Sequence, residues 1–135
     1  MLQLAYISSA KVPVDQALLD EILSKSRRNN ERVGVTGLLV CGGRRFLQVL
    51  EGPELAVLQT YARIQADDRH RAFVVISTMP VQERAFGHWS MAHGNGEAGG
   101  GVKLEELVTR LVGQIADPNL RAQFTGFASF HSRAA

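Results

Sequence analysis

Residues 46–52 read Phe46-Leu47-Gln48-Val49-Leu50-Glu51-Gly52, and this stretch decides the fold of the 135-residue chain. Its apolar character predicts a strand, and alternate side chains of a strand share a face, so Phe46, Gln48 and Leu50 point the same way. A carboxamide on the covered face of a sheet needs hydrogen-bond partners, because leaving it unpaired costs about 1–3 kcal/mol. The stretch therefore predicts a covered strand that carries one polar group among apolar neighbours.

The N-terminal stretch Leu2-Gln3-Leu4-Ala5-Tyr6-Ile7-Ser8 has a similar pattern. Tyr6 shares a strand face with Leu2 and Leu4. Two strands that each place a polar group on an apolar face predict a buried polar site, which could surround a ligand. The alternative is that Tyr6 and Gln48 simply satisfy each other or the backbone.

The segments around these strands predict the order β-α-β-β-α-β with an added strand. Strands are expected at residues 2–9, 35–41, 45–51, 72–79 and 86–93, and Gly42-Gly43 marks a two-residue hairpin. A first helix is expected from an N-cap at Asp15 to about Arg28, with Asn29-Asn30 at its end. The order is typical of an α+β ferredoxin-like sandwich, in which two helices cover one face of a mainly antiparallel sheet.

A second helix is expected to open at Gly52-Pro53 and to end near Asp67. The apolar residues recur at helical spacing, which predicts a broad apolar face toward the sheet. The residues expected on this face are Leu55, Leu58, Ala62 and Gln65, flanked by Val57, Tyr61 and Ile64.

The C-terminal part begins with a glycine-rich linker. We divide the chain into a domain at residues 1–93, the linker at 94–101 and a helical extension at 102–135. Leu104, Val108 and Ile115 belong to an apolar helical stripe, and Asp117-Pro118 predicts the start of another short helix. We expect the two short C-terminal helices to pack on the uncovered face of the sheet, or on another subunit.

Composition and charge exclude several classes of protein. The net charge of +2 and the lack of a basic stripe argue against nucleic acid as a partner. No apolar run approaches the roughly 20 residues that span a bilayer, so no membrane association is expected. The N-terminus lacks a signal peptide and the single Cys41 fits a reducing compartment, so we expect a cytoplasmic protein.

Motifs for catalysis and metal binding are missing from the sequence. There is no Walker-type phosphate loop, no Rossmann glycine fingerprint and no paired-cysteine zinc motif. The four histidines have no metal-ligand spacing, and Glu51 has no second carboxylate in register for acid–base work. Cys41 is interpreted as a packing residue. We therefore expect no metal site and no enzymatic activity.

Polar residues are instead expected to converge above Tyr6 and Gln48. Asn29 and Asn30 follow the first helix, while Asp67, Arg69 and His70 follow the second. A planar ligand between the two helices would meet all of them, with amides facing a heterocycle and cations facing a phosphate or ribityl tail. The alternative is that the asparagines cap a helix and residues 67–69 form a solvated turn.

At this point the chain resembles the BLUF domains, a family of blue-light sensors that use FAD. The resemblance covers residues 2 to about 91, and its specificity lies in the order and spacing of six short motifs. They are Tyr6-Ile7-Ser8, Ser26-Arg27-Arg28-Asn29-Asn30, Gly34-Val35-Thr36-Gly37-Leu38-Leu39, Phe46-Leu47-Gln48-Val49-Leu50-Glu51-Gly52, Asp67-Asp68-Arg69-His70 and Glu83-Arg84-Ala85-Phe86-Gly87-His88-Trp89-Ser90-Met91.

The resemblance implies roles for the residues on the covered face. Tyr6 matches the tyrosine that donates an electron to the photoexcited flavin. Gln48 matches the glutamine that links this tyrosine to the flavin ring and changes orientation or tautomer afterwards. Asn30 matches the asparagine that hydrogen-bonds the ring edge, and Asn29 occupies a neighbouring position that packs on the ring.

The resemblance also assigns the flanks of the ligand. Asp67, Arg69 and His70 match the region near the ribityl chain and phosphates. Ile22 and Ile64 resemble the aliphatic pair that sandwiches the ring.

Three further residues are carried over from the family. Ser26 would add a hydrogen bond in the pocket. Trp89 and Met91 match residues of the family's last strand, and the resemblance implies that the signal leaves the domain when these two side chains exchange positions. The sequence does not say which of the two faces the pocket in the dark. The cofactor implied is FAD, with FMN or riboflavin as related chromophores.

Many family members carry a cyclase or phosphodiesterase domain after the sensor, whereas this chain ends at Ala135. It therefore resembles the short stand-alone group, whose signal passes to a separate protein partner or through a homo-oligomer. Residues 102–115 are the candidate surface for that step. The alternatives are a small ferredoxin-like enzyme or metabolite-binding regulator that uses Gln48 and Asn30 for another ligand, and a light-blind adaptor that has lost FAD.

Overall fold

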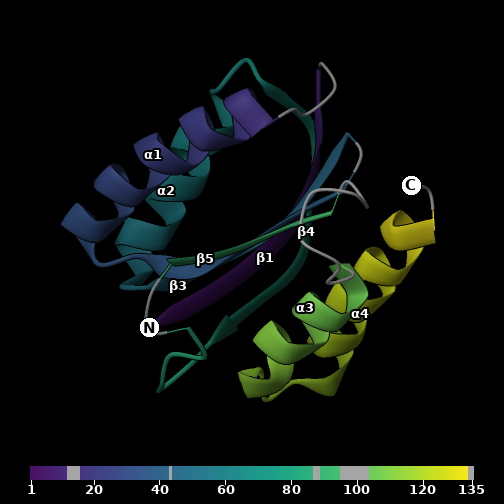
Figure 1. Ribbon diagram of the computed structural model, residues 1–135. Helices are drawn as coiled ribbons and strands as arrows, with labels where there is room; N and C mark the ends of the chain where they lie inside the picture. Colours follow the sequence, from purple (N-terminus) through teal and green to yellow (C-terminus); the bar gives the residue numbers. More distant parts are fainter. Residues whose placement is uncertain (12–15, 43, 87–88, 95–103, 134–135) are drawn as a thin grey trace.

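The structure is a computed structural model that describes residues 1–11, 16–42, 44–86, 89–94 and 104–133. In these ranges a five-stranded sheet has the order β4-β1-β3-β2-β5. Helices α1 and α2 lie on one face of the sheet, and α3 and α4 lie on the other (Figure 1). This arrangement confirms the predicted ferredoxin-like α+β fold with C-terminal helices packed on the sheet. The strands are β1 (Leu2–Ala10), β2 (Thr36–Gly42), β3 (Arg45–Gly52), β4 (His70–Pro80) and β5 (Trp89–Gly94); the helices are α1 (Gln16–Val33), α2 (Glu54–Gln65), α3 (Leu104–Leu111) and α4 (Pro118–Arg133), with a 3-10 turn at Val112–Gln114.

The register of the sheet places a group of polar side chains on each face. Tyr6 of β1 lies opposite Gln48 of β3, which lies opposite Leu39 of β2. Glu51 of β3 lies between Gln3 of β1 and Thr36 of β2 in the same way. Because successive residues of a strand face opposite sides, the first group belongs to the α1/α2 face and the second to the α3/α4 face.

Strand β3 is the middle strand of the sheet, and apolar groups cover it on both faces. Phe46 and Leu50 belong to the core beneath α1 and α2. Leu47 and Val49 belong to a second core with Phe124 of α4. This double coverage explains why apolar residues in positions 46–52 occur on both faces of the strand rather than on one.

The C-terminal helices build this second core. Asp117 Oδ1 accepts a hydrogen bond of 2.9 Å from the backbone N–H of Asn119, as the cap-plus-proline pattern predicted. Helix α4 then runs for 16 residues, which is longer than the short helix expected.

Residues 95–103, which include most of the predicted linker, lie outside the described residues. The predicted domain boundaries therefore stay a prediction.

The first helix is longer than the sequence analysis predicted. Helix α1 continues to Val33, so Asn29 and Asn30 lie within it rather than at its end. It stops at Gly34, whose φ of 76° lies in the left-handed region that commonly ends helices. The expected N-cap, Asp15, lies outside the described residues.

The prediction for the covered face of α2 was wrong. Leu55 and Leu58 are 67% and 43% exposed, whereas Val57 and Thr60 are buried. Tyr61 and Ile64, expected only as flanking residues, pack against the core beneath α1 and α2. Both sets of residues have helical spacing, so spacing alone could not decide which stripe faces the sheet.

Two backbone features shape the sheet. A Cβ atom on Gly37 would lie 1.9 Å from the carbonyl oxygen of Val49, so β2 and β3 approach each other closely only because this position is glycine. At one edge, β4 pairs with β1 through two shifts of register, and Ala72 has a φ of 56°. Val74 and Val75 of this edge strand are exposed.

Candidate functional site

A cavity of about 520 Å³ lies between α1 and α2 above the sheet. Its volume is within the range of small-molecule and cofactor sites, roughly 300–1,000 Å³. The structure brings most of the predicted site residues to its wall: Ile22, Ser26, Asn29, Asn30, Gln48, Ile64, Asp67, Arg69 and His70. Their individual roles stay predictions.

The floor of the cavity is built on the Tyr6–Gln48 pair. The Tyr6 hydroxyl donates a hydrogen bond to Gln48 Oε1, and both side chains are buried. Gln48 lines the cavity, whereas Tyr6 is not among its lining residues. Gln48 therefore connects Tyr6 to the cavity by a hydrogen bond.

Tyr6 is held in an aromatic cluster that excludes water. Its ring centroid lies 4.9 Å from that of Tyr61 and 5.7 Å from that of Phe73. Burial raises the pKa of the Tyr6 phenol, and Tyr61 adds to this effect. Tyr6 is consequently a neutral donor at physiological pH, which is the form that its hydrogen bond to Gln48 requires.

The two helices supply the walls above Gln48. Asn30 of α1 is buried and lines the cavity, and Ile22 lies two turns earlier on the same helix. Ile64 lines the cavity from α2. Aliphatic side chains from two opposing helices suit a flat ring, and the asparagine amide offers both donors and an acceptor to its edge.

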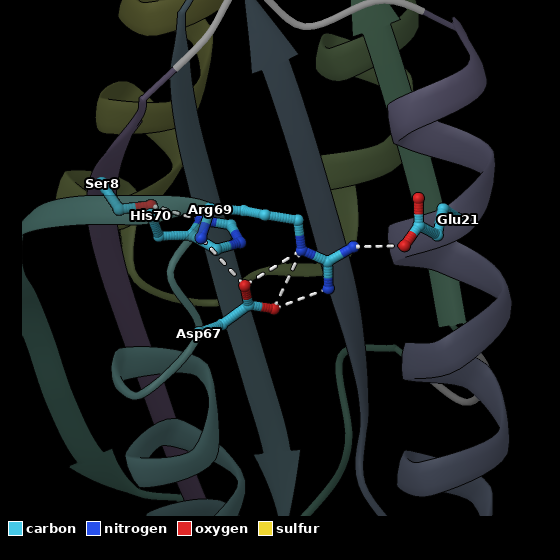
Figure 2. A network of polar contacts seen from close by, with 5 residues as sticks. All are labelled: Ser8, Glu21, Asp67, Arg69 and His70. Carbon is cyan, nitrogen blue, oxygen red and sulfur yellow. Dashed lines mark hydrogen bonds and ion pairs between the residues drawn. The ribbon is translucent and has the colours of Figure 1, made fainter.

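Charged residues after α2 line the cavity. Figure 2 shows how Asp67, Arg69 and His70 form a polar network that reaches Glu21 of α1. Asp67 holds Arg69 through both carboxylate oxygens, with the shortest contact at 2.6 Å. Hydrogen bonding from Arg69 lowers the pKa of Asp67 to about 2. Arg69 also reaches across to Glu21 of α1 in an ion pair of 3.4 Å.

The remaining atoms of this polar network suit an anionic or polyhydroxyl tail. Arg69 Nη1 is buried and has no hydrogen-bond partner among the described residues, only the longer ion pair with Glu21. A buried guanidinium N–H without a hydrogen bond is a favourable place for a phosphate or hydroxyl oxygen. Burial lowers the pKa of His70, whose Nδ1 lies 3.4 Å from Ser8 Oγ, so its imidazole is neutral at physiological pH.

Several lining residues were missed by sequence reasoning: Glu21, Lys25, Leu39, Thr60 and Arg63. Helical spacing from Ile22 and Ile64 could have found Lys25 and Thr60, and pairing with Gln48 could have found Leu39. The predicted output residues Trp89 and Met91 have backbones paired with Gly37 and Leu39. Their side chains lie outside what the structure describes.

Other candidate chemistry finds no support in the described ranges. Cys41 is buried, and desolvation raises the pKa of its thiol to about 12, so it is a packing residue rather than a nucleophile. In the part of the chain that the structure describes, no three His, Cys, Asp or Glu side chains gather to hold a metal ion. No described helix combines the length and apolarity needed to cross a membrane.

Comparison with known sequences gives a consistent answer. The family model described as "Sensors of blue-light using FAD" matches residues 1–92. The β subunit of a photoactivated adenylate cyclase from Euglena longa is 36% identical over 89 residues, which are 65% of this chain and 10% of that protein. The chain therefore spans about a tenth of the length of this curated relative.

Solved structures agree with this fold. BlrB, a BLUF protein in its dark state, matches with a TM-score of 0.72 at 23% identity, covering 99% of this chain and 96% of that one. Klebsiella pneumoniae BlrP1, in a structure with FMN and cyclic diGMP, matches with a TM-score of 0.73 at 26% identity, covering 99% of this chain and 36% of that one. With the cavity between α1 and α2 and the family match over residues 1–92, the chain belongs to the BLUF family of blue-light sensors.

Proposed function

We propose that this chain is a blue-light photoreceptor that holds FAD in the cavity between α1 and α2. The observation that carries the proposal is the buried Tyr6–Gln48 hydrogen bond at the floor of that cavity. A phenol that can lose an electron and a proton is joined there to an amide that can change its hydrogen-bond pattern.

The donor set of the cavity fits a flavin. Asn30 and Gln48 offer amide groups to the ring edge, and Ile22 and Ile64 offer apolar faces above and below it. Arg69, held by Asp67, offers Nη1, which has no hydrogen-bond partner among the described residues, to the ribityl or phosphate region. The same groups also fit FMN or riboflavin, and we propose FAD because the family description names it.

The residues of this chain would then act as follows. When bound, the flavin supplies the absorption of blue light and the acceptor for one electron. Tyr6 would give up that electron, and its phenolic proton would pass through Gln48, which would accept it at Oε1 and release one from Nε2 to the flavin. The Gln48 amide would be left rotated or tautomerised once the electron and the proton have returned to Tyr6. The rearranged state persists because its reversal requires the buried network to rearrange again.

We propose that the chain signals rather than catalyses. The support for this proposal is that residues 1–92 match the family model of a blue-light sensor. Strand β5, which carries Trp89 and Met91, and the helices beyond it are the proposed route of output. The signal would pass to a separate cytoplasmic partner protein or through a homo-oligomer.

The test is the visible absorption spectrum of the purified, FAD-loaded protein before and after blue light. We expect an oxidised-flavin spectrum with a small red shift that reverses in the dark. Tyr6→Phe and Gln48→Leu should both bind flavin and lose the shift, whereas Tyr61→Phe, which keeps the aromatic cluster, should retain it. A normal shift in Tyr6→Phe would contradict the electron-donor role. A protein that cannot be loaded with any flavin would favour a regulator that binds another ligand.

A further inference from the structure

Residues 84–86, between β4 and β5, are fastened to the end of β3 by a buried carboxylate. Glu51 is fully buried, and its Oε1 accepts a hydrogen bond of 2.7 Å from the backbone N–H of Phe86. Its Oε2 accepts one of 3.0 Å from the backbone N–H of Ala85 and one of 2.9 Å from Gln3 Nε2. We call Glu51 together with residues 84–86 the Glu51 clamp.

Arg84 fastens the same segment from its other side. Its Nη1 donates to Thr36 Oγ1 at 2.6 Å and to the backbone carbonyl of Glu51 at 3.1 Å. Its Nη2 donates to the carbonyl of Gly34 at 2.7 Å, and Thr36 Oγ1 donates to the carbonyl of Phe86 at 2.6 Å. The Glu51 clamp and Arg84 thus join the start of β2 and the end of β3 to residues 84–86, which precede β5.

Residues 84–86 are held by hydrogen bonds that involve the side chains of Glu51 and Arg84, in addition to any backbone hydrogen bonds of the turn. Hydrogen bonds to a carboxylate are about twice as strong as neutral ones, and those that Glu51 accepts from the Gln3 amide and from the backbone N–H of Phe86 are buried. Phe86, whose N–H is bound, is itself buried in the core formed with α3 and α4. A shift at the end of β3 is therefore transmitted directly to residues 84–86 and to that core, because a buried carboxylate that loses its donors is strongly penalised.

Glu51 lies on the same strand, β3, as the proposed photoactive glutamine, Gln48. Gln48 and Glu51 are three residues apart in β3, and their side chains lie on opposite faces of the sheet. Gln48 faces the cavity between α1 and α2, whereas Glu51 faces the side of α3 and α4. Strand β3 thus presents one of these side chains to each face of the sheet.

We propose that Glu51 is a positioning residue that couples Gln48 to residues 84–86 and to the start of β5. The inference rests on the proposed photoreceptor function. Rearrangement of Gln48 shifts β3, the shift loosens or tightens the Glu51 clamp, and the approach to β5 moves with it. Removing the Glu51 charge should uncouple the output segment while leaving the flavin chemistry intact.

The experiment measures amide hydrogen exchange of residues 84–86 in the full chain, in the dark and after blue light, together with the flavin absorption. In the wild type we expect light to change this exchange severalfold along with the red shift. Glu51→Gln keeps the shape but replaces one acceptor by a donor, so the red shift should remain and the light-driven change in exchange should disappear. In the flavin-free protein, Glu51→Gln should speed exchange of residues 84–86 by about tenfold.

Two further variants separate coupling from folding. Gln3→Met removes a hydrogen bond from the same carboxylate but leaves those from Ala85 and Phe86, so it should retain the light-driven change. Arg84→Gln removes the second set of bonds and should weaken the change, which serves as the test if Glu51→Gln fails to fold.

The outcomes distinguish the inference from the proposed function. A light-driven change in exchange that persists in Glu51→Gln would overturn the coupling role, as would a wild-type red shift without any change at residues 84–86. A wild type without a red shift would overturn the photoreceptor function and, with it, the light-driven half of the inference. The flavin-free exchange of Glu51→Gln would then still decide whether the clamp holds this segment.

Discussion

Replacing Gly37 by alanine should test how tightly β2 and β3 are joined. The new Cβ would lie 1.9 Å from the carbonyl oxygen of Val49, which is a backbone atom and cannot turn away. The two strands would have to separate by about 1 Å or more to restore ordinary contact distances. Overpacking of this kind costs about 1–3 kcal/mol, and weakening one or two ladder hydrogen bonds adds about 1 kcal/mol each.

We therefore expect Gly37→Ala to lower the free energy of unfolding by about 3 kcal/mol, which is a large part of the total for a domain of this size. Urea unfolding of the flavin-free protein, followed by circular dichroism, would measure it with little change in the denaturant slope. The matched control is Gly126→Ala in α4, where an added Cβ meets no atom within 4 Å. The Gly126→Ala change should raise the free energy of unfolding by about 0.5–1 kcal/mol, because alanine favours a helix more than glycine does. A Gly37→Ala variant as stable as the wild type would refute the reasoning.

Two other predictions concern the lining of the cavity and the C-terminal helices. Burial lowers the pKa of His70 below its ordinary 6.5, so the unfolded chain binds a proton that the folded chain resists, and stability should fall as the pH drops below 6.5 until it passes the folded pKa. His70→Gln should remove this share of the loss in urea titrations between pH 8 and 5, and identical pH profiles for the two proteins would speak against it. Phe124→Ala should cost about 3–5 kcal/mol because Phe124 is fully buried, whereas Phe130→Ala, at a side chain that is 66% exposed, should cost far less. Equal losses in the two variants would contradict the described orientation of α4.

The alternation of side chains predicted much of the fold. It placed Tyr6 and Gln48 on the covered face of two strands, and the structure confirms that both are buried on the α1/α2 face. It could not show that the two lie directly opposite each other, because register depends on how the strands are joined and covered. The helical pattern likewise found α2 but chose the stripe of Leu55 and Leu58, which is exposed.

The role of Glu51 lay beyond any pattern of residue types. The sequence has no second carboxylate in register with Glu51 that would have marked it as a site residue. The partners of Glu51 are mainly backbone N–H groups more than thirty residues away in the chain. Every residue except proline carries such a group, so composition and spacing hold no signal for them. The cavity residues after α2 were easier to predict because charged side chains in a short turn are visible as a motif.

The outer strand β4 has a consequence for how the chain behaves among many copies of itself. Val74 and Val75 lie exposed on an edge whose backbone groups could otherwise pair with the edge of another molecule. The two register shifts against β1 and the left-handed backbone of Ala72 bend this edge, so it offers no long, straight row of donors and acceptors. The irregular course of this apolar outer strand should therefore disfavour edge-to-edge pairing between copies of the chain.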